Sequence, residues 1–196
     1  MEAKRLEQKE TQEGIIPDDI MQSTPMISPA DAPRAFHVMA KPTGALCNLH
    51  CDYCFFQKKK SLYPESNFLM SDAVHEAYIR QLFESHQVPE VIVAWQGGEP
   101  ILMGLDFFKH SVALQNKFAK PGTRVENSFQ TNGILLNDDW CRFFHDNNFL
   151  VGLSLDGPKA FHDTYRKDKS GKGTFDRVVT DDRSGGFRKT AKVRSG

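Results

Sequence analysis

Short apolar runs recur along the chain and predict β-strands. Residues 90–95 (EVIVAW) are rich in β-branched side chains, and residues 149–155 (FLVGLSL) form a continuous apolar run. Residues 124–131 are also interpreted as a strand, and a further apolar run at 35–41 stops before Pro42. The pattern therefore predicts four strands.

Amphipathic segments fill the intervals between these strands. Helices are predicted at 71–86, 105–120 and 137–148, and Ser71 or Asp72 is suited to cap the first of them. Strands that alternate with helices are typical of right-handed βαβ crossovers and a parallel sheet. The fold class is therefore expected to be α/β, with about four parallel strands and interleaved helices.

The two ends of the chain do not continue this pattern. Residues 1–33 are polar, with several prolines and no sustained period, and we expect a disordered N-terminal lead. The core domain is expected over residues 34–180. Residues 181–196 carry paired glycines and scattered basic residues without an apolar face, which predicts an atypical, disordered tail.

Charge and hydropathy narrow the class of partner. The 25 basic residues balance the 25 acidic ones, so net charge makes no case for nucleic acid or an anionic membrane. No apolar stretch is long enough to span a bilayer, and the N-terminus lacks the apolar core of a secretory signal. We therefore expect a cytoplasmic protein, in which thiols stay reduced.

Residues that carry chemistry follow the predicted strands directly. Ligands of parallel sheets bind beyond the carboxyl ends of the strands, because loops and helix N-termini converge there. In chain order the four segments are Cys47-x3-Cys51-x2-Cys54, Gly97-Gly98-Glu99-Pro100, Gln130-Thr131-Asn132-Gly133 and Asp156-Gly157-Pro158.

The three clustered cysteines suit an iron–sulfur cluster. Cys47, Cys51 and Cys54 could hold three corners of a [4Fe–4S] cluster and leave its fourth iron without a protein ligand. A zinc site completed by His50 or a distant histidine, or a purely structural loop, are the alternatives. Zinc sites more often use paired C-x2-C motifs, so the spacing favours the cluster. Cys141, in a predicted helix, is expected to be an inert buried thiol.

Four further motifs identify a family. The segments "KPTGALCNLHCDYCFF", "WQGGEP", "FQTNG" and "VGLSLDGP", with "YRKD" after the last, resemble the radical S-adenosylmethionine (SAM) superfamily, and strongly resemble the anaerobic sulfatase-maturating enzymes. The resemblance covers about residues 35–178. It implies the N-terminal portion of a partial (β/α)6 barrel and an oxidoreductase that converts a cysteine or serine of a sulfatase to Cα-formylglycine.

The resemblance also implies two cofactors, a [4Fe–4S] cluster and SAM. The amino and carboxylate groups of SAM would chelate the open iron, and an electron from the cluster would cleave the sulfonium to give a 5′-deoxyadenosyl radical. The cofactors would supply the difficult chemistry, and the protein their position and the exclusion of water.

Contacts with SAM are assigned by resemblance to residues near the strand ends, namely Tyr53, Gly97, Gly98, Glu99, Thr131, Asn132, Ser154 and Arg166. The glutamate would accept from the methionyl ammonium, and the two glycines would let the backbone approach it closely. The serine and the arginine would hold the carboxylate, and the tyrosine would lie beside the adenine. The Thr131-Asn132 pair would lie near the ribose or the substrate.

By resemblance, the partners are a sulfatase polypeptide as substrate and a reductant protein such as flavodoxin or ferredoxin. No nucleic-acid or membrane partner is expected.

The chain also departs from the family. The resembling enzymes continue through two more strand–helix units and a cysteine-rich C-terminal region that binds two auxiliary clusters, whereas only Cys141 follows Cys54 here. We therefore expect the auxiliary-cluster domain to be absent and the chain to be a truncated maturase. The alternative is a catalytically incompetent remnant or a non-enzymatic protein, for which some relatives carry the label of sulfatase regulator.

Overall fold

A single parallel sheet organises the described part of the chain. The computed structural model describes residues 33–183 and 192–194. The chain divides between Pro33 and Arg34 into two units, and all described helices and strands lie in the second. The five strands pair in chain order and are all parallel: β1 (Met39–Ala40), β2 (Glu90–Trp95), β3 (Arg124–Thr131), β4 (Phe149–Leu153) and β5 (Lys192–Arg194).

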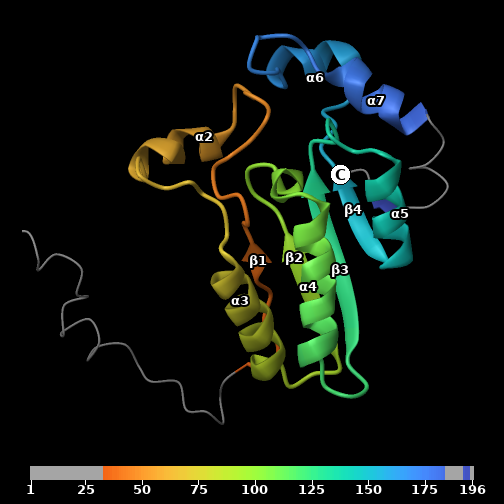
Figure 1. Cartoon of the computed structure of the whole chain (residues 1–196). Helices are drawn as coiled ribbons and strands as arrows, with labels where there is room; N and C mark the ends of the chain where they lie inside the picture. Colours follow the sequence, from red (N-terminus) through yellow and green to blue (C-terminus); the bar gives the residue numbers. More distant parts are fainter. Residues whose placement is uncertain (1–32, 184–191, 195–196) are drawn as a thin grey trace, which may run out of the picture. The chain divides into compact units, whose positions relative to one another are not determined.

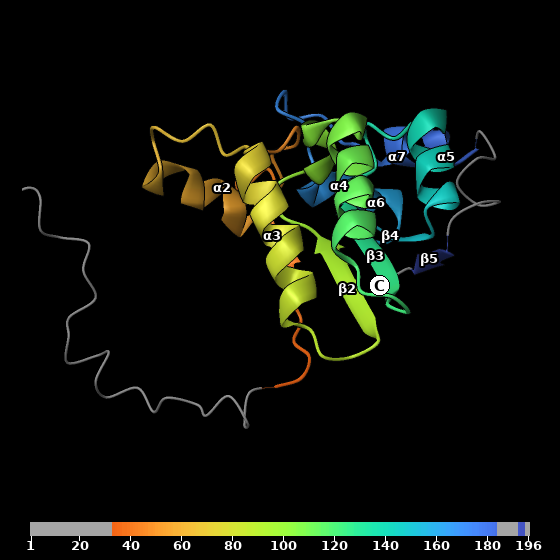
Figure 2. The ribbon, with the colours of Figure 1, turned by 60° about the horizontal axis from the view of Figure 1, so that its bottom comes forward.

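Three helices cover one face of this sheet (Figures 1 and 2). They are α3 (Asp72–Ser85), α4 (Leu105–Phe118) and α5 (Asp138–Asp146). Because side chains alternate across a strand, every second residue of β2, β3 and β4 points toward these helices. The main core consists of these strand residues and the apolar faces of the three helices.

The opposite face of the sheet is hollowed. Met39, Ser128, Gln130 and Leu150 line a cavity of about 320 Å³ on that side. Met39 and Leu150 are at least one-third exposed, whereas the strand residues that face the helices are buried. One face of the sheet is therefore packed against helices in the core, and the other face lines an open cavity.

The predicted α/β class with four parallel strands and interleaved helices is confirmed. The bounds of β2 and β3 match the predicted strands to the residue, and α3, α4 and α5 lie within their predicted ranges. Ser71 caps α3 by accepting the Val74 N–H, as the sequence indicates, and Asn137 caps α5 by accepting the Trp140 N–H.

Some local predictions were wrong. Of the predicted strand 35–41 only Met39 and Ala40 join the sheet. Residues 35–38 are exposed, and the chain turns after Ala40, where Gly44 N–H donates to Lys41 O. Two short helices, α2 (Phe55–Lys59) and α6 (Lys159–Tyr165), lie in segments without a predicted element. Neither is long enough to show a helical period in sequence.

Part of the predicted tail belongs to regular structure. Residues 181–183 complete α7 (Phe175–Arg183), and residues 192–194 form β5 beside β4. The predicted N-terminal lead, apart from Pro33, and the rest of the tail lie outside the described residues, so the domain boundaries stay predictions. Among the described helices, none combines the length and the apolar character needed to cross a bilayer.

The topology determines where a site can form. Since the strands are parallel neighbours, their carboxyl ends share one edge of the sheet, and the short helices α2, α6 and α7 lie at that end (Figure 1). The cysteine loop after β1 therefore meets the loops that follow β2, β3 and β4.

Phe108 tests the packing of the core. Its fully buried ring contacts the rings of Trp95, Phe129 and Trp140. We expect Phe108→Ala to lower the free energy of unfolding by about 3–5 kcal/mol, because it leaves a cavity between α4 and the sheet. Urea denaturation followed by circular dichroism measures this loss. The exposed Phe161 is the control, and Phe161→Ala should change stability by less than about 0.5 kcal/mol.

Candidate iron–sulfur and SAM site

The three clustered cysteines lie half-buried in one loop at the carboxyl edge of the sheet. Cys54 N–H donates to Cys51 O at 3.0 Å, which turns the loop between the second and third thiols. Burial raises the pKa of Cys47, and it raises that of Cys51 to about 11, with the neighbouring thiols adding to both shifts. A cationic group would therefore be needed beside Cys47 and Cys51 to hold these two as thiolates.

An apolar shell surrounds two of these thiols. Cys47 and Cys51 pack against Leu49, Ile134 and Val178, which form a small cluster apart from the main core. These residues come from the cysteine loop, the loop after β3 and α7. Such a shell limits the access of water to the sulfur atoms, and solvent access tunes the redox properties of bound metal.

Two protein donors point at the first thiol. Leu49 N–H donates to Cys47 Sγ at 3.4 Å, and Asn132 Nδ2 lies 3.7 Å from the same sulfur. Asn132 Nδ2 also donates to Asn48 Oδ1 at 2.7 Å. Hydrogen bonds to sulfur are one way in which proteins set the potential of iron–sulfur clusters.

The chain segment 165–168 clamps the cysteine loop from the other side. His50 N–H donates to Lys167 O at 2.8 Å, and Asp52 N–H donates to Tyr165 O at 3.0 Å. Lys167 Nζ also pairs with Asp52 Oδ2 at 3.0 Å. The "YRKD" motif thus supports the cysteine loop through its backbone, a role that its residue types alone do not indicate.

Glu99 joins the strand-end loops. Its carboxylate accepts from Thr131 Oγ1 at 2.8 Å, Asn132 N–H at 2.8 Å and Ile101 N–H at 3.2 Å, while its own N–H donates to Leu46 O at 2.7 Å. Burial raises the pKa of Glu99, and the three donors oppose that rise. The side chain is almost fully buried, so its first role is to hold the loops together.

The two glycines before Glu99 are required by contacts within the protein. Both have positive φ, and a Cβ on Gly98 would lie 2.1 Å from Leu46 O. A Cβ on Gly97 would lie 2.7 Å from the Lys41 side chain. The close approach that the sequence analysis assigned to SAM is therefore already needed for packing of this segment against the residues that lead to Cys47.

Thr131 and Asn132 are also engaged with protein groups. Besides donating to Glu99, the Thr131 hydroxyl accepts the Gly133 N–H at 3.1 Å, and Asn132 Oδ1 accepts the Ile134 N–H at 3.0 Å. Ser154 differs, because its hydroxyl oxygen accepts from Gln130 Nε2 at 2.8 Å and its own proton can be donated elsewhere.

Tyr53 and Arg166 meet at Asp156. The Tyr53 hydroxyl donates to Asp156 Oδ2 at 2.7 Å, and Arg166 Nε lies 2.9 Å from Asp156 Oδ1, although its N–H is not aligned on that oxygen. The guanidinium also lies 5.5 Å from the centre of the Tyr53 ring. Burial opposes ionisation of Asp156, but the hydrogen bond from Tyr53 and the positive charge of Arg166 lower its pKa. The structure thus brings together two expected SAM contacts around the carboxylate of Asp156, a strand-end residue for which the sequence indicated no role.

Sequence reasoning also missed a buried histidine. His162 Nδ1 accepts the Asp156 N–H at 3.4 Å, so Nε2 carries the proton and donates to Thr174 Oγ1 at 3.0 Å. Thr174 in turn donates to Arg166 O at 3.0 Å. This chain of bonds orients Asp156 and Arg166. No local sequence signal links Thr174 to the "YRKD" motif, so these contacts could not have been predicted.

The donor set fits a four-iron cluster. Each cysteine of such a cluster binds a different iron, so the three sulfurs need not converge on one point. Among the described residues, no three His, Cys, Asp or Glu side chains lie close enough together to hold a single metal ion. Cys141 lies apart from the cysteine loop, on α5, where it packs against the main core.

The sheet, the cysteine loop and the strand-end residues define an α/β protein with a cluster-binding loop, and comparison with known proteins agrees. Residues 42–180 match the radical SAM superfamily. The chain therefore belongs to the radical SAM superfamily, whose cofactors are a [4Fe–4S] cluster and SAM.

Several similar proteins are named as sulfatase-maturating enzymes. The chain is 46% identical over 147 residues to a serine-type anaerobic sulfatase-maturating enzyme of Bacteroides thetaiotaomicron, covering 74% of this chain and 35% of the relative. It is 40% identical over 142 residues to a cysteine-type anaerobic sulfatase-maturating enzyme of Clostridium perfringens, covering 72% and 38%.

A solved structure shares the fold. It is described as native anSMEcpe with bound AdoMet and Cp18Cys peptide, and it matches with a TM-score of 0.71 and 37% identity over 80% of this chain and 41% of that one. The chain thus spans between 35% and 41% of the length of the two relatives and the structure named above.

Gly98 tests the contact between the "GGEP" segment and the cysteine loop. We expect Gly98→Ala to lose most of its iron after anaerobic reconstitution, because the new Cβ would displace Leu46 O. Gly122 is the matched control, since its φ is also positive and a Cβ added there would meet nothing within 4 Å. Gly122→Ala should lose about 1 kcal/mol of stability and keep its iron. Equal iron contents in the two variants would contradict the close contact.

Proposed function

We propose that this chain binds a [4Fe–4S] cluster through Cys47, Cys51 and Cys54, binds SAM beside it, and forms the cofactor-binding part of a sulfatase-maturating activity. The observation that carries the proposal is the placement of three half-buried thiols in one loop at the carboxyl edge of the sheet. Apolar side chains pack against Cys47 and Cys51, and two protein groups donate to the Cys47 sulfur. When bound together, the two cofactors supply the radical that abstracts a hydrogen atom from the substrate.

The protein groups proposed to hold SAM differ in how many hydrogen-bond positions their protein partners leave open. Ser154 can donate its hydroxyl proton to the SAM carboxylate, and the Arg166 guanidinium supplies positive charge beside it. Glu99 keeps one acceptor position on Oε2, since that oxygen receives a single protein donor. Tyr53, which is about half exposed, offers a ring face near Arg166 for the adenine.

For the other predicted contacts we propose an indirect role. Gly97, Gly98, Thr131 and Asn132 position the cysteine loop and the loop after β3 through the contacts given above. Their effect on SAM is then exerted by holding the groups that touch it. This assignment makes them positioning residues.

The substrate class follows from the relatives. We propose a sulfatase polypeptide that carries the cysteine or serine to be oxidised, as the names of the relatives indicate, and a low-potential reductant protein such as flavodoxin or ferredoxin as electron donor. A cytoplasmic location, where thiols stay reduced, is the setting that such chemistry needs.

Cofactor binding is the first test. After anaerobic reconstitution with iron and sulfide, the chain should hold about four irons, with the visible absorption of a [4Fe–4S] cluster. Cys51→Ala should lose the cluster, whereas Cys141→Ala, on α5, should keep it. Iron and sulfide analysis measures both. One zinc per chain without visible absorption would refute the proposal.

Catalysis is the second test. With a chemical reductant under anaerobic conditions, the chain should cleave SAM slowly to 5′-deoxyadenosine without modifying a sulfatase-derived cysteine peptide. Hydrogen abstraction needs reacting atoms within about 3–3.5 Å, and this chain spans less than half of the relatives that would hold the peptide. Chromatography detects the nucleoside, and mass spectrometry detects the peptide. Stoichiometric conversion of the thiol to an aldehyde would show that the chain alone is a complete maturase.

A further inference from the structure

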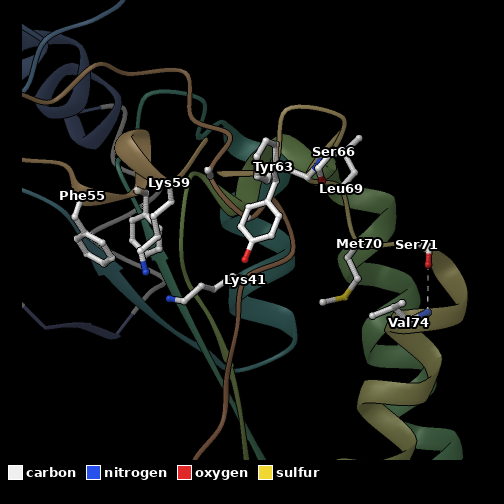
Figure 3. A pocket seen from close by; sticks show the side chains of 13 residues that line it. Lys41, Phe55, Lys59, Tyr63, Ser66, Leu69, Met70, Ser71 and Val74 are labelled. Atoms are coloured by element: carbon white, nitrogen blue, oxygen red, sulfur yellow. Dashed lines mark hydrogen bonds between the residues drawn. The ribbon is translucent and has the colours of Figure 1, made fainter. Parts of the chain in front are cut away.

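Two hollows flank helix α2, which follows the cysteine loop directly. The larger, of about 550 Å³, lies between α2 and the segment that leads into α3 (Figure 3). The smaller, of about 300 Å³, lies between α2 and the cysteine loop, and Cys47 itself lines it. Ala45 lines both, so the two hollows adjoin each other beside the proposed cluster.

Two ammonium groups and two rings form a contiguous group in the larger hollow. Lys41 Nζ lies 4.7 Å from the centre of the Phe56 ring, and Lys59 Nζ lies 5.3 Å from that of Phe55. The two ring centres are 4.2 Å apart. Cations held over aromatic rings are ordered yet still accessible to an anionic partner. Figure 3 shows Phe55 and Lys59 at one end of this hollow and Met70 and Val74 at the other.

The charged residues that line the two hollows are lysines. Lys41 and Lys59 line the larger hollow, and Lys60 and Lys169 line the smaller, while none of the described residues that line either is acidic. Glu65, in the loop after the short helix η2 (Lys60–Leu62), lines neither. The chain as a whole has equal numbers of acidic and basic residues, so this one-sided distribution is local.

Apolar side chains are exposed between these lysines. Phe55, Leu62 and Tyr63 are 57%, 68% and 60% exposed, and Leu69 and Val74 are about half exposed. An exposed apolar patch with a charged rim is typical of a protein-binding surface. We call this region, formed by α2, η2 and the lining of the two hollows, the α2 surface.

We infer that the α2 surface docks an acidic one-electron donor protein, which presents an apolar patch rimmed by carboxylates. The inference rests on the proposed function, since a cluster that cleaves SAM must receive an electron. In the transfer, the reduced donor loses one electron and the oxidised cluster gains it, with no bond made or broken in either protein. The lysines attract and orient the donor, and the hollow lined by Cys47 brings it close to the cluster ligands.

A nucleic acid is the less favoured partner for the same lysines. Single-stranded nucleic acids bind through open ring faces on which bases stack. Here the faces of Phe55 and Phe56 are engaged by each other and by Lys59 and Lys41. A protein that covers the whole patch makes use of the exposed leucine, tyrosine and valine as well.

Charge reversal on α2 tests the docking. The test variant is Lys59→Glu with Lys60→Glu, and the control is Lys109→Glu with Lys117→Glu on α4. Lys117 lies in the last turn of its helix as Lys59 does, and both control lysines are in exposed ion pairs of little energetic weight. Circular dichroism and iron content should be the same for both variants and the unmodified chain.

The first measurement is association, which requires no cluster. An acidic flavodoxin with a fluorescent label is titrated with the cluster-free chain at low ionic strength, and binding is followed by anisotropy. The test variant should bind flavodoxin about tenfold more weakly than the unmodified chain, and the control variant should bind as tightly as the unmodified chain. High salt should remove the difference between the two variants. Equal binding by the two variants, or no binding by the unmodified chain, would overturn the inference. A labelled single-stranded oligonucleotide that binds more tightly than flavodoxin would also overturn it.

The second measurement is the rate of cluster reduction. Reduced flavodoxin should bleach the visible absorption of the reconstituted test variant about tenfold more slowly than that of the control variant. Photoreduced 5-deazariboflavin, which is small and uncharged, should reduce the clusters of both variants at the same rate. Equal rates with flavodoxin would refute docking at this surface. Failure of the chain to take up a cluster would instead refute the proposed function, and the association measurement would still decide the docking.

Discussion

The buried carboxylate of Glu99 is the interaction on which the site depends. An ionised carboxylate taken out of water is stable only when donors replace the water that it loses. Here the donors come from Thr131, Asn132 and Ile101, and the backbone of Glu99 reaches Leu46 in the segment before the first cysteine. The carboxylate is therefore satisfied only when the segments after β2 and β3 are in place together, and the Glu99 backbone ties them to the segment before Cys47.

The cysteine loop is held from two sides by different means. On one side, Gly98 approaches the Leu46 carbonyl so closely that no side chain fits, and Asn132 reaches Asn48 and Cys47. On the other side, residues 165–168 pair with the loop backbone, and the buried His162, just before that segment, accepts the Asp156 N–H. A loop held in this way can position three thiols without contributing any regular strand of its own.

The surroundings of the thiols are asymmetric. Toward the sheet and α7, Cys47 and Cys51 meet apolar side chains that limit the access of water. Toward α2, Cys47 lines a hollow whose charged residues are lysines. Radical chemistry benefits from the first environment, because water competes for reactive intermediates, and delivery of an electron by a protein benefits from the second.

The sequence alone predicted the strands and helices that have a clear local pattern, and the chemically active residues at their ends. The strands at 90–95 and 124–131 were predictable because alternation and β-branching are local, and parallel topology then placed the cysteines, Glu99 and Asn132 at one edge. Only the tertiary structure decided that β1 is two residues long, that α2 and α6 form, and that Glu99, Asp156 and His162 have the partners they do. These features depend on contacts between residues far apart in the chain, for which no local period exists.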